Sequence, residues 1–379
     1  MKLTNVLLTA LLGLLFASCT GKVEISVFNN SEVDRVNEMV EICLCELKEF
    51  DASKLVILNA DGKQVPYQVL YKGGEKPMAL IFPVTLKSGA ETTFTLKEGT
   101  PEHFTARTNA RFVPERKDDL SWENDKIGFR MYGPALANEY PSNGVDVWLK
   151  KTDKLVFDQW YKNDLSHKAS YHEDHGEGLD CYGVGHTLGC GGICPYMNDS
   201  LFVGDHFDRY EILDNGPLRS SFMLYYDAIP FGTKKLKAEL LITLDAGSNL
   251  NEARIRYFGD TTHIQLAAGI FLHDSIQSVN ANVSQGYISY AENAVTQDAK
   301  KVPSGRCYTG VVFPEQKMKT KQLAKHIVGI FDYKVGDEFR YFFGAGWNKF
   351  GFKNDSDWSL YLADKRTALM QPLKVKILK

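Results

Sequence analysis

Short runs in which apolar and polar residues alternate recur along most of this chain. Alternation with a period of two places every second side chain on one face of an extended strand, as expected when that face is buried. In the N-terminal part the runs are separated by turn signals, of which Asp61-Gly62 is the clearest, and no helical period of useful length appears. These runs occupy residues 23–28, 38–43, 55–59, 65–70, 78–82 and 92–96. We expect them to form a small β-sandwich.

Further strand-like runs follow a polar, weakly periodic stretch at residues 99–110, which resembles a linker. Because they are separated by long stretches of sequence, we expect a second, large antiparallel β-sandwich with a curved concave face, of the mutarotase-like super-sandwich kind. The runs lie at residues 127–132, 145–149, 219–226, 238–244, 252–257, 265–272, 326–333 and 340–344. The expected division is therefore 1–18 as a signal peptide, 19–105 as the first sandwich and 106–379 as the second, all in an all-β chain.

The composition excludes two classes of protein. Hydrophobic residues make up 44% of the 379 residues and charged residues 24%, so the chain can bury a core and is not disordered. The formal net charge of -3 provides no basic excess for binding phosphate backbones, so we expect no nucleic-acid partner.

The N-terminus is typical of a bacterial lipoprotein signal. A lysine at position 2 precedes an apolar run at residues 6–16, and Ala17-Ser18 precede Cys19. We expect cleavage before Cys19 and lipid on its thiol, with an uncleaved anchor as the alternative. The protein is then exported and lipid-anchored, on the periplasmic or the outer-membrane face, and the membrane is one of its partners.

Six further cysteines leave several arrangements open. Cys43 and Cys45 have strand spacing, which favours two buried core thiols. Cys190 and Cys194 have the spacing of some metal clamps, but only Cys181 lies near them. Structural thiols or one disulfide are therefore favoured over a metal site; no cofactor is indicated, although a divalent cation stays possible.

Residues 115–134 form the first segment that favours a binding site. Trp122 stands beside Glu123 and Asn124, a combination that suits a sugar, because a ring stacks on C–H faces while polar groups pair with hydroxyls. The alternative is a core tryptophan at a sheet corner. Another segment, residues 344–352, contains Trp347, which either lines the same binding site or closes the end of the sandwich.

Residues 171–192 form the segment richest in chemistry. Its glycines allow backbone bends that bring titratable groups together, and a loop of this length is usually functional. We expect a site here, and His172 with Asp174 or His175 is a possible metal pair. The candidate groups are His172, Asp174, His175, Asp180, Tyr182 and His186.

Two of these runs, residues 122–134 and 171–185, together with the signal peptide, resemble a Bacteroidetes lipoprotein family of unknown function. The resemblance covers nearly the whole mature chain, and the second run is the more specific. Members occur among polysaccharide-degradation proteins, which implies a setting among glycans rich in uronic acid, such as pectin or ulvan. The resemblance implies no assignment of catalytic residues.

The leading functional hypothesis is a lyase or dehydratase that performs β-elimination on uronic-acid oligosaccharides. Such a reaction needs a base, an acid and a cation that neutralises the substrate carboxylate. His172 is the expected base and Tyr182 the expected acid, with Arg130 or Arg116 as the cation. A glycoside hydrolase with Glu123 and Asp180 as opposed carboxylates, a carbohydrate-binding lipoprotein and a sugar epimerase or mutarotase are the alternatives.

Overall fold

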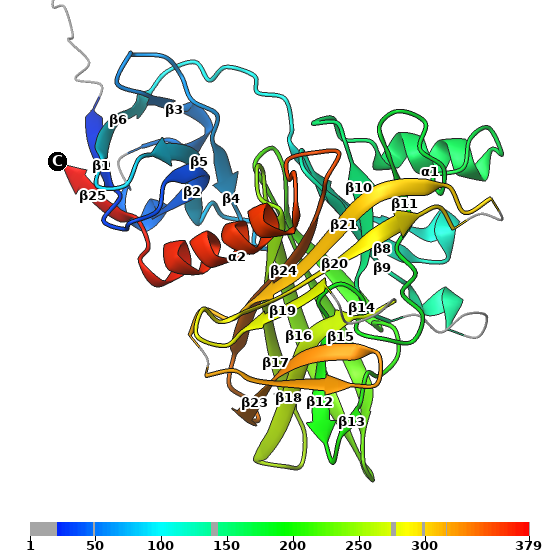
Figure 1. Ribbon diagram of the computed structural model, residues 1–379. Coiled ribbons are helices and arrows are strands. Elements are labelled where there is room, and N and C mark those ends of the chain that lie inside the picture. The colour runs from blue at the N-terminus through cyan, green and yellow to red at the C-terminus, as the bar shows by residue number, and fades with distance from the viewer. Residues whose placement is uncertain are drawn as a thin grey trace, which may run out of the picture.

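The computed structural model describes residues 21–47, 50–137, 143–273, 278–297, 300–315 and 317–378. Within these ranges the chain is mostly antiparallel sheet and forms a small and a large β-sandwich that lie side by side (Figure 1). The expected all-β class is confirmed. Cys19 lies outside the described residues. No described helix is long and apolar enough to cross a membrane.

The small sandwich consists of two sheets that bury a shared apolar core. Alternate residues of its strands point inward, among them Ile25, Ile57 and Phe82, none of which has any exposed surface. One sheet has the order β25-β1-β6-β3 and the other β2-β5-β4. The bounds are β1 Lys22–Phe28, β2 Arg35–Cys43, β3 Leu55–Leu58, β4 Gln68–Leu70, β5 Ala79–Leu86, β6 Glu91–Glu98 and β25 Lys374–Leu378.

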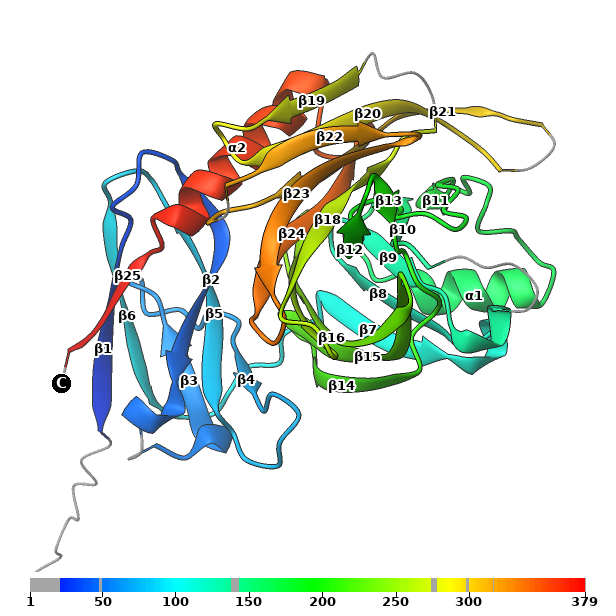
Figure 2. The same ribbon diagram turned by 90° about the horizontal axis from the view of Figure 1, so that it is seen from below.

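The last strand of the chain belongs to the first sandwich. β25 pairs antiparallel with β1, from Glu24 opposite Leu378 to Phe28 opposite Lys374, and it lies beside β1 in Figure 2. The sequence-based division at residue 105 therefore needs an amendment, since residues 374–378 complete the N-terminal sheet. Alternation alone does not reveal which sheet a strand joins.

The large sandwich is built around an eight-stranded antiparallel sheet in the order β14-β15-β16-β17-β24-β21-β20-β19. Two five-stranded sheets, β11-β10-β9-β8-β7 and β13-β12-β18-β23-β22, pack against its inner face around one extensive core. The strands of the large sheet are β14 Arg209–Asn215, β15 Arg219–Phe231, β16 Lys234–Asp245, β17 Leu250–Phe258, β19 Val279–Asn282, β20 Tyr287–Val295, β21 Pro303–Val312 and β24 Phe339–Trp347. The strands of the other two are β7 Thr108–Val113, β8 Asp119–Asn124, β9 Gly128–Met131, β10 Asp146–Lys150, β11 Gly178–Asp180, β12 Ile193–Met197, β13 Ser200–Leu201, β18 His263–Phe271, β22 Lys319–Leu323 and β23 His326–Lys334.

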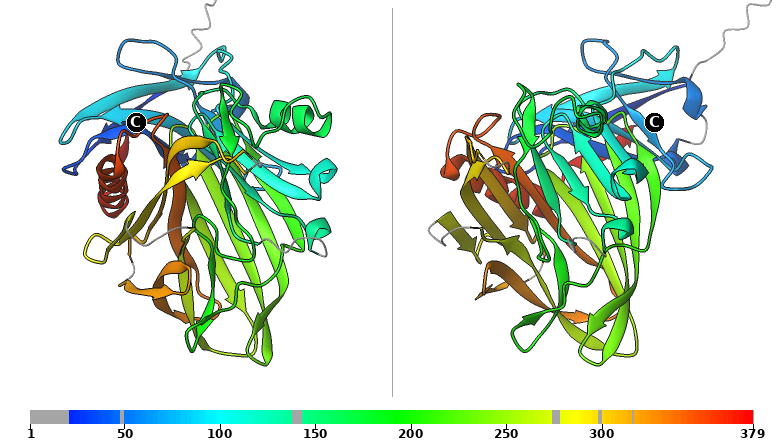
Figure 3. Two further views of the ribbon diagram at one scale, coloured as in Figure 1. Left: turned by 45° about the vertical axis from the view of Figure 1, so that its right-hand side comes forward. Right: turned by 90° about the vertical axis from the view of Figure 1, so that its right-hand side faces the viewer.

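Two α-helices lie on opposite sides of the large sandwich (Figure 3). Helix α2 (Asp355–Met370) begins at Asn354, whose side chain accepts a hydrogen bond from the backbone N–H of Asp357. Its buried Trp358 and Leu362 pack on the outer face of the eight-stranded sheet. Helix α1 (Phe157–Leu165) buries Phe157, Trp160 and Tyr161 against Trp148 of β10. Both helices bury aromatic side chains, which in the sequence favoured strands.

The cysteines differ in part from expectation. Cys43 and Cys45 are exposed and joined by a disulfide, so the prediction of two buried core thiols was wrong. The reason is that β2 ends at Cys43 and a 3₁₀ turn over Leu44–Glu46 brings the two side chains together at the surface. Cys190, Cys194 and Cys307 are buried free thiols, and Cys181 is a half-buried one.

Candidate functional site

A buried polar network lies in the five-stranded sheet beside helix α1. The register places Asp146 opposite Arg130 and Asp180 opposite Trp148, so three neighbouring strands contribute side chains to one point. Arg130 Nη2 lies 2.6 Å from Asp146 Oδ2 and 2.9 Å from Asp180 Oδ2. Arg130 Nη1 lies 3.7 Å from Asp119 Oδ2. One guanidinium thus faces three buried carboxyl groups.

Burial disfavours the ionised form of these carboxyls. It raises the pKa of Asp146 to about 7 and the pKa of both Asp119 and Asp180 to about 6, against the opposing attraction of Arg130. The three aspartates therefore titrate close to neutrality as a coupled group, and the network can hold or release a proton in the physiological range.

His172 connects this network with solvent. Its Nδ1 lies 3.2 Å from the Asp180 backbone oxygen and 3.6 Å from Asp180 Oδ2, and its side chain is 32% exposed. Burial lowers the pKa of the imidazole below its usual value, so the ring is neutral at pH 7. When Nδ1–H donates to the backbone oxygen, Nε2 keeps its lone pair. This tautomer is the one that a general base requires.

Tyr171 links His172 with Arg116. The Tyr171 and His172 ring centroids are 4.6 Å apart, and Arg116 Nε donates to the Tyr171 hydroxyl at 3.1 Å. Arg116 is half-buried, whereas Arg130 is completely buried among its carboxyl partners. Arg116 is therefore the cation of this site that an outside ligand can reach.

The loop before β11 holds His175 near His172. The backbone N–H of His172 donates to Ser170 Oγ at 3.2 Å, and His175 Nε2 lies 3.0 Å from the Ser170 backbone oxygen. Ser170 and His175 also line a small hollow of about 40 Å³. Asp174 turns away to Lys151 Nζ at 2.7 Å, an ion pair that lowers the pKa of the carboxyl. Asp174, named in the possible metal pair with His172, is thus paired with Lys151, and no group of three or more metal-ligating side chains was found in the described part of the chain.

The aromatic platform expected from the sequence is absent from the surface. Trp122 is 1% exposed and its Nε1–H donates to Asn251 Oδ1 at 2.7 Å. Trp347 is also 1% exposed and donates to the Ser304 backbone oxygen at 2.8 Å. Neither ring offers a face to a sugar, because both pack in the core of the large sandwich. The burial of both rings agrees with the alternative interpretation, in which the tryptophans belong to the core and do not line a cleft.

Glu123 and Asn124 hold the backbone together rather than facing solvent. Glu123 Oε2 pairs with Lys150 Nζ at 2.5 Å, while its Oε1 accepts from the backbone N–H groups of Val156 and Phe157 at 2.8 and 2.7 Å. Glu123 therefore caps the start of α1. Asn124 Nδ2 donates to the backbone oxygens of Asp245 and Ser248 at 2.6 and 2.7 Å. The expectation that Glu123 and Asn124 contact a substrate directly is therefore corrected, because both side chains are completely buried.

Two more candidates lie apart from His172. Tyr182 is 1% exposed, its hydroxyl donates to the Phe271 backbone oxygen at 3.4 Å, and burial raises the pKa of its phenol far above the usual value. It is therefore poorly suited to donate a proton to a substrate. His186 is exposed and bonds through Nε2 to the Gly204 backbone oxygen at 2.9 Å, away from the network.

Sequence reasoning missed a histidine–glutamate pair on the other side of the same segment. His273 Nδ1 lies 2.9 Å from Glu292 Oε2, and His273 Nε2 lies 2.5 Å from the Gly183 backbone oxygen. The pair lines an open groove of about 390 Å³ together with Cys181 and Tyr182. Both ring nitrogens of His273 therefore face oxygen atoms. His273 and Glu292 come from separate strand regions, so no local motif marks them.

Comparison with known proteins adds a family and a fold. The model of the domain of unknown function DUF4861 matches residues 27–375. A protein of Formosa agariphila described as "Uncharacterized protein P7" is 32% identical over an alignment of 314 positions, which covers 79% of this chain and 78% of that protein.

Two solved structures from Enterococcus faecalis share the fold at very low sequence identity. An alpha-mannosidase of strain V583 has a TM-score of 0.57 at 9% identity, and a protein in the glycosyl hydrolase family 38 has a TM-score of 0.53 at 10% identity. Each match covers 94% of this chain but only 46% and 47% of those chains. The likeness thus concerns less than half of each solved chain and shows the fold alone. By the family match over residues 27–375 and the Formosa relative, the chain belongs to the DUF4861 family.

Proposed function

We propose that this protein is a glycan-active enzyme that performs β-elimination on uronic-acid oligosaccharides. The observation that carries the proposal is the His172–Asp180 pair at the mouth of the buried aspartate network, with Arg116 beside it through Tyr171. A neutral imidazole with a fixed tautomer, next to a reachable guanidinium, is the combination that removal of a proton beside a carboxylate requires.

The proposed step begins when Arg116 binds the carboxylate of the uronic acid. Neutralising that carboxylate makes the C5–H bond acidic. His172 Nε2 takes the C5 proton, the electron pair forms the C4=C5 double bond, and the C4–O bond breaks. The departing oxygen receives a proton from the new imidazolium or from water. The products are an unsaturated uronate and a hydroxyl compound, or water when the C4 substituent is a free hydroxyl.

The network behind His172 has a positioning role in this proposal. Asp180 holds the imidazole through its backbone oxygen and carboxyl, and Arg130 holds Asp180. A negative group behind the ring stabilises the imidazolium that forms when the C5 proton arrives. Arg130 itself is engaged by three carboxyl groups. The proposed role of binding the substrate carboxylate therefore falls to Arg116 and not to Arg130.

The alternatives receive less support from the geometry. A hydrolase needs two opposed carboxylates that reach one glycosidic bond, and Glu123 is occupied by Lys150 and the start of α1. A pure binding module needs an exposed stacking surface, which Trp122 and Trp347 do not provide. The two fold neighbours, an alpha-mannosidase and a protein in the glycosyl hydrolase family 38, support a glycan as the ligand class.

The test uses the purified protein with a panel of uronate oligosaccharides and follows absorbance of the unsaturated product. H172A should lower turnover by about 10²–10⁴-fold, and R116A should mainly raise KM for charged substrates while sparing a methyl-ester substrate. H263A, at an exposed histidine at the start of β18, is the matched control and should retain activity.

Two results would count against this assignment. If H273A abolishes turnover while H172A retains it, the reaction centre is the groove with Glu292. If no uronate oligosaccharide gives an unsaturated product, elimination itself is refuted. We also propose that the protein is exported and anchored through lipid on Cys19, which would place it where oligosaccharides arrive.

A further inference from the structure

The outer face of the eight-stranded sheet changes from apolar to polar along one row of residues. One row of cross-strand neighbours runs from Val312 through Phe342 and Glu252 to Thr243 and Ser221. Val312 and Phe342 are apolar and covered by α2. Glu252, Thr243 and Ser221 lie beyond the helix and are polar. The sheet therefore keeps a polar outer surface where α2 stops covering it.

A cleft of about 400 Å³ lies above this polar part of the row. Its walls come from three places: the sheet, through Thr243 and Glu252; the C-terminal half of α2, through Lys365 and Leu369; and β2 with its preceding turn in the small sandwich, through Asn37. Packed side chains fill the interior of a domain. This junction instead leaves an open, polar volume, and ligand sites occur preferentially at such places.

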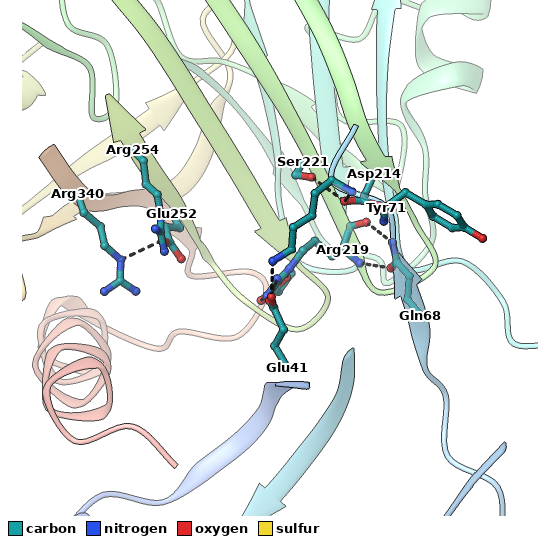
Figure 4. Close-up of polar contacts among 11 residues, drawn as sticks. Glu41, Gln68, Tyr71, Asp214, Arg219, Ser221, Glu252, Arg254 and Arg340 are labelled. Atoms are coloured by element: carbon teal, nitrogen blue, oxygen red, sulfur yellow. Dashed lines mark hydrogen bonds and ion pairs between the residues drawn. The ribbon is translucent and has the colours of Figure 1, made fainter. Parts of the chain in front are cut away.

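The charged groups along the cleft are held in fixed positions by partners. Glu252 Oε1 accepts from Arg254 Nε at 2.5 Å and from Arg340 Nε at 2.9 Å. Arg219 makes a double hydrogen bond with Asp245 at 2.6 and 2.9 Å and also pairs with Glu41 at 2.6 Å. Figure 4 shows both groups, with Arg219 reaching toward Glu41 of the small sandwich.

These pairs define the chemical class of ligand. The carboxylates of Glu252 and Asp245 line the cleft and can accept further hydrogen bonds while their charges are largely compensated. Acidic side chains outnumber basic ones among the residues that line the cleft, which disfavours an anionic ligand. Val36, which is 70% exposed, and the half-buried Leu369 line the same cleft and suit C–H faces. A neutral molecule with many hydroxyl groups meets all three conditions.

We propose that this cleft, defined by Thr243, Glu252, Asn37, Val36 and Leu369, is a binding site for neutral sugar units, separate from the His172 site. Its ligand class follows from the chemistry of the cleft and does not depend on the elimination reaction. In an enzyme acting on mixed polysaccharides, such a site would hold a neutral stretch of the chain while a uronate unit is processed elsewhere.

The test is calorimetry with neutral tetrasaccharides of xylose, mannose, galactose and glucose, and with a uronate tetrasaccharide for comparison. At least one neutral tetrasaccharide should bind, and T243W, which fills the cleft, should weaken that binding about tenfold or more. T320W is the matched control, because Thr320 is a half-buried threonine in the distant strand β22. E252Q tests the same wall without added bulk and should weaken binding several-fold, which covers the case in which T243W fails to fold.

Three results would overturn the proposal: none of the neutral tetrasaccharides binds, T243W and E252Q bind like the wild type, or only the uronate competes for the cleft. H172A separates this proposal from the proposed function, since it should leave binding of the neutral tetrasaccharide unchanged. If no uronate oligosaccharide is eliminated but the neutral tetrasaccharide still binds in the cleft, the proposed function is refuted and the binding site is retained.

Discussion

Replacing Glu123 with glutamine tests whether the most deeply buried ion pair of the candidate region is structural. Glu123 and Lys150 are 1% and 0% exposed, and Glu123 also accepts from two backbone N–H groups at the start of α1. The amide of E123Q can still accept one backbone bond, but its NH₂ group faces the Lys150 ammonium, donor against donor. The Lys150 charge is then left buried without a counter-charge.

The size of the effect follows from this loss. Breaking a buried ion pair by removing one charge costs about 3–5 kcal/mol, because the remaining charge is uncompensated. For a unit of this size, 1 kcal/mol lowers Tm by about 2–4 °C, so E123Q should lose roughly 6–20 °C. Replacing both partners, as in E123Q/K150M, removes the orphaned charge and should recover part of the loss.

The measurement is calorimetry with urea unfolding as a second probe, and E115Q is the matched control. Glu115 lies in the same segment, but its pair with Arg111 is 41% and 32% exposed on the two sides, and a surface pair contributes only about 0–1 kcal/mol. An E123Q protein that unfolds like E115Q would refute the reasoning. So would an E123Q protein of normal stability that has lost turnover, since Glu123 would then act on substrate.

Three further predictions concern other parts of the molecule. The pKa of Asp146 is raised to about 7, so the folded state binds a proton more tightly than the unfolded chain, and the contribution of Asp146 to stability is lost as pH rises through about 4–7. The unfolding free energy of the wild type minus that of D146N should therefore fall from pH 5 to pH 8, by at most about 1.4 kcal/mol per pH unit. A difference that stays constant with pH in urea titrations would contradict this prediction. G128A should cost about 1–3 kcal/mol or more, because the new Cβ would lie 2.1 Å from Phe157 Cζ, and an unchanged urea midpoint would show that the site can relax. C19S should move the protein from the membrane to the soluble fraction on cell fractionation, and material that stays membrane-bound would remove Cys19 as the anchor.

The sequence predicted the class of fold well because alternation is a local signal. The runs at residues 23–28, 238–244 and 252–257 all fall within observed strands, and buried positions alternate throughout the second and third runs. The place of β25 could not be predicted in the same way, because a sheet joins residues that are far apart in the chain. The two α-helices were missed because their buried aromatic residues favour strands when read alone.

For the candidate site, the sequence suggested segments that the fold partly brings together, but not the surroundings of each side chain. Residues 171–180 did supply His172, Asp180 and the hydrogen-bonding loop around them. Burial decided the rest. Trp122 and Arg130 look like ligand-binding groups in a sequence, yet one packs in the core and the other is surrounded by aspartates. His273 and Glu292 lie on separate strand regions, so only the fold brings them together.

The pairing of β25 with β1 affects the order in which the protein can fold. The edge of β1 that β25 occupies stays open until the last residues of the chain have left the ribosome and, for an exported protein, have crossed the membrane. The large sandwich is complete in sequence before that moment, so it can fold first and deliver β25 through helix α2. A fragment ending at residue 105 would have an uncovered strand edge, which is a template for aggregation. The small sandwich begins before the large one in the sequence but can be completed only after it.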